Sequence, residues 1–260
     1  MLGVAYASKV GIFMLIECYG VLPGTLGDIA QEASGAVGRV AVEVSLVVSQ
    51  FAVCCAMLIF VLRSAEAAIV PHASAEESHT FRLRCIGVSL LVLVPLNWVR
   101  NLSKLALSNL VANACVLFGV GISVVYLSRQ LAMDGVPDDV VIAKPSTIAI
   151  FLGTTCYAFE GIPLVLPVYE SMRHKENFSR VFSRVFWVGV AGLETAYGLV
   201  GYLAFGEHIN PVSILSIPLS PFTRTVLLLF SAAIVLGFPM MFVPASRIFE
   251  SYLWTGVSPA

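Results

Sequence analysis

Long apolar stretches with few ionisable side chains are the feature that most restricts how this chain can fold. A helix needs roughly 20 mostly apolar residues to cross about 30 Å of hydrocarbon. We therefore expect an all-α, polytopic membrane helix bundle that forms a single transmembrane domain over residues 1–260. The expected spans are approximately 2–20, 40–62, 85–99, 105–128, 147–169, 185–205 and 222–246.

The amino-acid composition is typical of a protein embedded in a lipid bilayer. Hydrophobic residues make up 58% of the chain and charged residues 12%, whereas soluble domains are about half apolar and a quarter charged. The charges gather between the apolar runs instead of following amphipathic faces. The formal net charge is -1, and no stripe rich in Lys and Arg occurs. The expected partner is thus the lipid bilayer, and nucleic acid is excluded because phosphate binding needs a basic surface.

Enzyme and metal chemistry find no support in the sequence. The six cysteines lie in or beside apolar runs, without a CxxC spacing or a nearby histidine, so we interpret them as small buried hydrophobes. No GxGD or HExxH motif occurs, and no span contains G-x-S-x-G. We expect no enzymatic activity, no metal site and no cofactor.

The expected span at 147–169 contains residues that weaken a helix. Gly153 and Gly161 are conformationally permissive, and Pro163 and Pro167 each remove a backbone hydrogen-bond donor. Irregular backbone at membrane depth is tolerated where it lines a cavity or is buried in protein. We expect the helix to be interrupted near 153–158, and the neighbouring spans to be regular.

Four acidic residues fall inside or at the edge of expected spans: Glu17, Glu43, Glu160 and Glu194. An ionised acid at the centre of a membrane costs a few kcal/mol, so a functional role is the default hypothesis for each. The alternative is a protonated or paired structural group. Glu160 is the strongest candidate because it lies in the span that we expect to be broken.

The segment 153–161 combines what a small zwitterionic ligand needs inside a membrane. Unwound backbone offers amides to a carboxylate and carbonyls to an ammonium group. Two threonine hydroxyls add polar contacts, aromatic rings can line a side-chain pocket, and a carboxyl can bind a proton or neutralise a cation. The alternative is a kinked structural helix whose small residues pack against neighbours. The residues concerned are Gly153, Thr154, Thr155, Tyr157, Phe159 and Glu160.

The loops predict an orientation. The loop at 170–184 is the most basic and is expected in the cytoplasm, which places the acidic loops at 63–84 and 129–146 outside. Two glycosylation sequences, starting at Asn101 and Asn177, then lie on the cytoplasmic side and should stay unmodified.

Four stretches, in order, carry a resemblance to a known family. They are GDIAQEASGAVGR (27–39) running into SQFAVCCAMLIFV (49–61), NWVRNLSKLALSNLVAN (97–113), FLGTTCYAFEGIPLVLPVYESM (151–172) and GYLAFGEHINPVSILSIP (201–218). With them the chain resembles the amino acid/auxin permease family, especially its proton-coupled and vacuolar amino acid transporter branches.

The resemblance implies the inverted-repeat fold of the amino acid/polyamine/organocation superfamily, in which the first helix of each half unwinds around the ligand. Span 147–169 is similar to the first helix of the second half. Gly153, Thr154 and Thr155 then match the unwound segment, while Tyr157, Ala158, Phe159 and Glu160 match the pocket edge and gate. The implied substrate site is Gly153, Thr154, Thr155, Tyr157, Ala158 and Phe159, and the implied ion-coupling residue is Glu160.

The implied function is secondary transport of neutral amino acids, driven by a proton or sodium gradient or by exchange. The implied location is the plasma membrane or a vacuolar or lysosomal membrane. Residues 1–20 resemble the second helix of the family and the last span resembles the eighth, so the resemblance predicts an incomplete chain that lacks the first helix and the last helices. A truncated, non-transporting amino-acid sensor or partner protein is the alternative.

Overall fold

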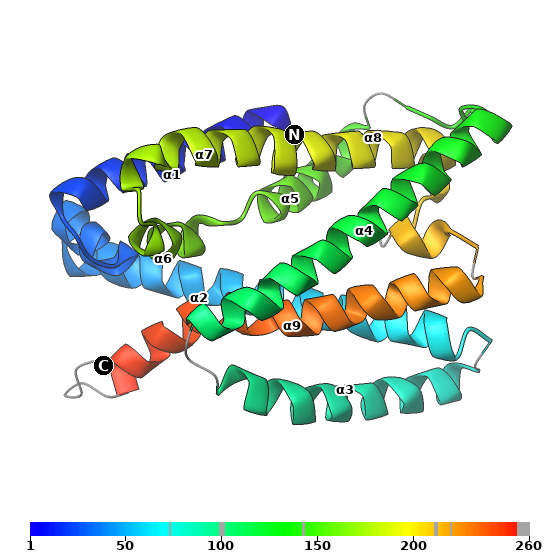
Figure 1. The fold of residues 1–260 in the computed structure, drawn as a ribbon, viewed down its shortest axis with the longest axis horizontal. Coiled ribbons are helices and arrows are strands. Elements are labelled where there is room, and N and C mark those ends of the chain that lie inside the picture. The colour runs from blue at the N-terminus through cyan, green and yellow to red at the C-terminus, as the bar shows by residue number, and fades with distance from the viewer. Residues whose placement is uncertain (73, 99–101, 142–143, 211–212, 219, 254–260) are drawn as a thin grey trace. The chain divides into compact units, whose positions relative to one another are not determined.

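The computed structural model describes residues 1–72, 74–98, 102–141, 144–210, 213–218 and 220–253, and of these it leaves out the side chains of 102–108 and 213. Every regular element in this described part is helical (Figure 1). Seven helical stretches are long and apolar enough to cross a membrane, which confirms the polytopic helix bundle. They are Leu2–Val21, Leu26–Ile69, Ala75–Asn97, Asn109–Asp134, Pro145–Ser171, Lys175–His208 and Pro221–Leu253.

The elements follow the expected order, with some longer helices and more interruptions than we expected. They are α1 (Leu2–Val21), α2 (Leu26–Ile69), α3 (Ala75–Asn97), α4 (Leu102–Asp134), η1 (Pro145–Thr147), α5 (Ile148–Ala158), α6 (Ile162–Ser171), η2 (Lys175–Asn177), α7 (Phe178–Arg184), η3 (Val185–Gly192), α8 (Leu193–Phe205), η4 (Gly206–His208), η5 (Ser213–Ser216) and α9 (Pro221–Leu253). The chain divides into two compact units, one formed by 1–48 and 141–199, the other by 49–140 and 200–260.

Helix α3 begins about ten residues before the expected span at 85–99. Its start is a capping box: the Ser74 hydroxyl accepts a hydrogen bond from the Glu77 amide, and the Glu77 carboxylate accepts one from the Ser74 amide. Such a box satisfies two backbone donors that a helix start leaves open. The charged first turns are helical although they interrupt the apolar pattern.

Two helical stretches are irregular. In α2, Gly35 has a φ of 68° and a ψ of -165°. These angles are not helical, so α2 is kinked at this residue into two helical segments. In the last span of the first unit, residues Val185–Gly192 form a π-helix between α7 and α8. The expectation that the spans beside 147–169 are regular is therefore wrong for 185–205. A π-helix inserts extra backbone into a turn and is frequent at functional sites.

In the first unit, α1 packs against α6 and η3. One apolar cluster joins Ala5 to Phe159, Phe186 and Ala191, and another joins Ile12 to Val165 and Phe178. The rings of Phe178, Phe182 and Phe186 stack in sequence, with centroids 5.3 and 5.5 Å apart. This row of rings lies on one helix face because the residues are four positions apart.

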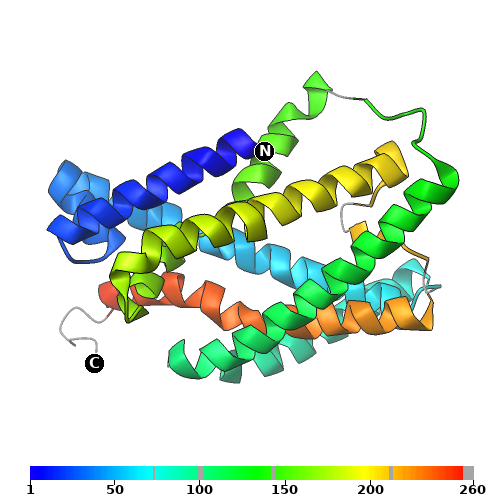
Figure 2. The ribbon, with the colours of Figure 1, turned by 45° about the horizontal axis from the view of Figure 1, so that its top comes forward.

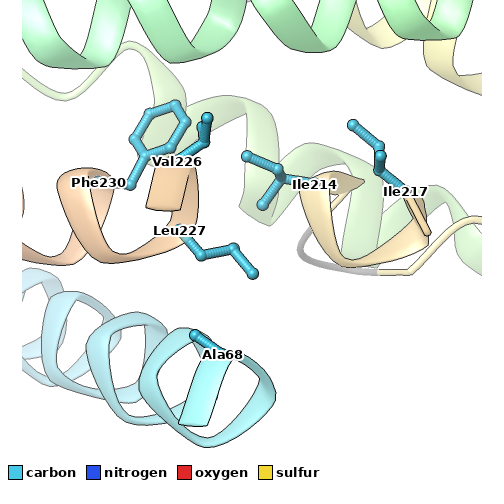
Figure 3. Close-up of a cluster of buried hydrophobic side chains, with 6 residues drawn as sticks. All are labelled: Ala68, Ile214, Ile217, Val226, Leu227 and Phe230. Atoms are coloured by element: carbon cyan, nitrogen blue, oxygen red, sulfur yellow. The ribbon is translucent and has the colours of Figure 1, made fainter. Parts of the chain in front are cut away.

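In the second unit, α4 and α9 lie side by side, and α3 lies along α9 (Figures 1 and 2). The main apolar cluster consists of Ala68, Ile214, Ile217, Val226, Leu227 and Phe230 (Figure 3). Gly119 of α4 allows this close approach, since a Cβ at that position would lie 2.2 Å from the ring of Phe230.

Candidate functional site

The break in the span Pro145–Ser171 lies at Phe159–Gly161, beyond the region 153–158 where we expected it. Helix α5 is continuous through Gly153, Thr154 and Thr155 up to Ala158, so the prediction that these residues unwind is wrong. A glycine costs a helix only about 1 kcal/mol, and the apolar residues around Gly153 maintain it. Pro163 costs a helix more, because it has no amide to bond the carbonyl of Phe159. Together with Gly161 it favours a break at this point.

The hydrogen bonds at the break show the change of backbone geometry. The Phe159 amide still donates to Thr155 O at 3.2 Å, whereas the Glu160 amide donates to Tyr157 O at 3.2 Å, in a tighter turn. Gly161, with φ -155° and ψ -4°, is the N-cap of α6 and contributes no side-chain cap.

This arrangement suits a zwitterion. The carbonyl end of α5 carries partial negative charge and favours an ammonium group, and the amide end of α6 carries partial positive charge and favours a carboxylate. Both ends meet within three residues, so partial charges of both signs lie at one place in the chain.

The threonine hydroxyls point to a structural role. Thr154 Oγ1 donates to Ile150 O at 2.9 Å, and Thr155 Oγ1 donates to Phe151 O at 2.7 Å. Both bonds stay within α5, and such bonds to the carbonyl four residues earlier tend to bend a helix. Thr155 is buried, whereas Thr154 is exposed.

The remaining predicted residues lie at the break but differ in burial. Phe159 is 4% exposed, and its ring centroid lies 5.8 Å from that of Phe186 in the cluster with Ala5. Tyr157 is 48% exposed. Ala158 and Glu160 are half-buried, and Glu160 takes part in an interaction of its own. Phe159 therefore packs the break against the π-helix, whereas the Tyr157 ring is exposed and Glu160 is half-buried.

The four acids of the expected spans have different surroundings. Glu17 is exposed on α1. Glu43 is 6% exposed and receives a hydrogen bond from the Arg39 guanidinium at 2.9 Å. Glu194 is half-buried and follows the π-helix, and within the described ranges its Oε2 is buried without a hydrogen-bond partner.

A charge network around Gly35 escaped the sequence reasoning. The Arg39 guanidinium lies 3.2 Å from the Asp28 carboxylate, 2.8 Å from the Gln31 amide oxygen and 2.9 Å from the Glu43 carboxylate. It therefore connects the two segments of α2 on either side of the kink at Gly35. The spacing of Arg39 and Glu43, four residues apart, was the available signal. In the part of the chain that the structure describes, no group of three or more His, Cys, Asp or Glu side chains could hold a metal ion.

The two N-x-S sequences, which we expect to stay unmodified, begin at Asn101 and Asn177. Asn101 lies outside the described residues. Asn177 is exposed and is the N-cap of α7.

The family "Transmembrane amino acid transporter protein" matches residues 1–256. The chain is 31% identical over 98% of its length to vacuolar amino acid transporter 3 of Schizosaccharomyces pombe, and 31% identical over 87% to vacuolar amino acid transporter 4 of Saccharomyces cerevisiae. It is also 30% identical over 66% of its length to the proton-coupled amino acid transporter-like protein pathetic of Drosophila melanogaster.

The chain spans only about a third of the length of these relatives, covering 38%, 32% and 36% of them respectively. No solved structure matches the chain. The family is described as a transporter, not as an enzyme. With a family match over nearly all of its residues and seven apolar helices of membrane-spanning length, the chain belongs to the transmembrane amino acid transporter proteins.

Proposed function

We propose that the protein moves amino acids across a membrane and that the substrate backbone binds at Phe159–Gly161. The observation that carries this proposal is the broken span inside a chain matched over residues 1–256 by the family. Opposed helix ends supply partial charges of both signs at one place, which suits the ammonium and carboxylate groups that all amino acids share.

The substrate class that we propose is neutral amino acids. Tyr157 offers exposed aromatic surface beside the break, the buried ring of Phe159 supports it from behind, and Glu160 is the acid within the break. The proposed substrate contacts include Gly153, Thr154 and Ala158. These residues are helical, so we propose that they contact the substrate from the surface of α5 and not through unwound backbone. Thr155 contributes indirectly, because its carbonyl holds the Phe159 amide.

The proposed coupling ion is the proton, bound by Glu160. The name of the Drosophila relative supports proton coupling, and the names of the yeast relatives support a vacuolar-type membrane. Moving one charge across 100 mV yields about 2.3 kcal/mol, which sustains roughly fiftyfold accumulation of a neutral substrate.

The test reconstitutes the complete gene product in liposomes and follows labelled amino acids with and without an imposed pH gradient. Glu160→Gln should abolish gradient-driven accumulation and leave substrate exchange largely intact. Glu17→Gln, which changes an exposed acid on α1, is the matched control and should behave like the unmodified protein. Accumulation by Glu160→Gln would show that the coupling site lies elsewhere. Amino acid binding without flux would favour the non-transporting binding protein.

A further inference from the structure

The connection after α4 is fastened to the end of α8 by one carboxylate. Asp139 lies in this connection, and its Oδ2 accepts a hydrogen bond from the Glu207 amide at 2.9 Å. Glu207 belongs to the short helix η4, directly after α8. The bond therefore joins two connecting segments that lie 68 residues apart in the sequence and belong to the same compact unit.

Gly206 makes room for the carboxylate. Its φ is 59°, a conformation that residues with a side chain rarely adopt. A Cβ on Gly206 would lie 2.2 Å from Asp139 Oδ1, so the carboxylate occupies the space where a side chain would stand. This oxygen is buried and, among the residues that the structure describes, has no hydrogen-bond partner. The carboxylate thus keeps unused acceptor capacity.

A histidine stands beside the same carboxylate. His208 Nε2 lies 3.9 Å from Asp139 Oδ2, and the imidazole is 90% exposed while the Asp139 side chain is 35% exposed. Histidine is the side chain that gains a proton between about pH 8 and pH 5. A protonated imidazole at this distance attracts the carboxylate, whereas a neutral imidazole has no net charge to do so.

We propose that Asp139 is a positioning residue that holds the connection after α4 against Gly206, Glu207 and His208 of η4. Protonation of His208 strengthens this contact. The other titratable groups of the two segments are Asp138 and Glu207, which are acidic and exposed, and Lys144, the N-cap of η1. At the end of α4 stand Arg129 and Asp134, and Asp134 already accepts a hydrogen bond from Gln130.

The test measures hydrogen exchange of the Glu207 amide in the complete chain, in lipid nanodiscs, at pH 5.5 and pH 7.5. Comparing variants at one pH removes the intrinsic effect of pH on exchange. Asp139→Ala should accelerate exchange of this amide at both pH values, by about two- to tenfold, because it removes the acceptor. Asp139→Asn keeps an acceptor but loses the charge, so it should retain most protection at pH 7.5.

The pH effect separates the proposal from a merely structural contact. In the unmodified protein, protection should rise about two- to fivefold at pH 5.5, as expected for a partly exposed ion pair. His208→Asn and Asp139→Asn should each abolish this rise, and His79→Asn, at another exposed histidine, should keep it. Unchanged exchange in Asp139→Ala, or an equal rise in His208→Asn, would overturn the proposal. Protection of α9 amides reports whether each variant folds, and none of these results depends on transport.

Discussion

The two halves of the broken span, α5 and α6 (Figure 1), differ in their contacts with the rest of the first unit. In α6, Val165 and Leu166 are buried, and the ring of Tyr169 lies against Phe178 with centroids 5.2 Å apart. The Tyr19 hydroxyl of α1 donates to Glu170 at 2.7 Å. Helix α6 is thus anchored by packing, by aromatic contacts and by a hydrogen bond.

Helix α5 has no comparable anchor in the described structure. Among its residues only Thr155 is buried, while Ile150 is 70% and Phe151 50% exposed. Both halves are apolar, so hydropathy does not distinguish them. The break separates these halves, so we expect that α5 can shift about Phe159–Gly161 without disturbing the contacts of α6. The difference predicts that α6 contributes to stability and α5 to movement.

The largest expected effect comes from removing the ring against which α6 packs. Phe178→Ala should lower the free energy of unfolding by about 3–5 kcal/mol, since Phe178 is 3% exposed and packs with Val165 and Ile12. The matched change on α5, Phe151→Ala, should cost about 1 kcal/mol or less because that ring is half exposed. Unfolding in mixed micelles measures both. Equal losses would mean that the two halves are anchored alike.

A second change should make α5 and α6 one continuous helix, so that α5 is anchored through α6. Gly161→Ala with Pro163→Ala restores an amide and favours helix by roughly 3–4 kcal/mol in intrinsic propensity. A Cβ at Gly161 meets no atom within 4 Å, so the alanine fits. Hydrogen exchange of residues 159–164 should slow, and amino acid exchange should fall at least about tenfold. Full exchange activity in a protein with a joined helix would exclude the break as the substrate site.

The sequence was sufficient for the architecture because apolar length decides which helices can cross a membrane. All seven expected spans overlap a helix of membrane-spanning length. The sequence also indicated that the span at 147–169 is interrupted. It misplaced the interruption because a single glycine costs a helix only about 1 kcal/mol, whereas Gly161 and Pro163 together favour a break, and they lie later in the chain than Gly153.

Packing is what the sequence could not predict. The burial of Phe159 depends on Phe186, and the π-helix that carries Phe186 has no signal in the apolar pattern. The hydroxyls of Thr154 and Thr155 were available for a ligand in the sequence, yet each is bound to its own helix. That the chain forms one transmembrane domain, and that the residues of the break bind a substrate, stay predictions.

A smaller effect should come from the hydrogen bond that ties α6 to α1. Tyr19→Phe removes the donor to Glu170 but keeps the ring, whose centroid lies 5.9 Å from that of Tyr169. The expected loss of stability is about 1 kcal/mol, because the bond is exposed and water can replace the hydroxyl. Tyr6→Phe, on the same helix with its side chain 62% exposed, is the control. A loss as large as that of Phe178→Ala would show that polar contacts, not packing, anchor α6.

The smallest expected effect is that Asn177 is not glycosylated. This result would decide which side of the membrane α5 and α6 each approach. Helix α6 ends shortly before Asn177, so a cytoplasmic Asn177 places the anchored half toward the cytoplasm and α5 toward the opposite side. Asn177 should carry no sugar when the protein is expressed in cells that glycosylate N-x-S sequences. The control is His72→Asn, which completes such a sequence with Ser74 in a connection that we expect outside. Both positions are exposed and lie near helix ends, so access to the glycosylation machinery is comparable. A mass shift on gels that glycosidase reverses should appear only in His72→Asn. Sugar on Asn177, with none added by His72→Asn, would reverse the orientation and place the anchored half outside.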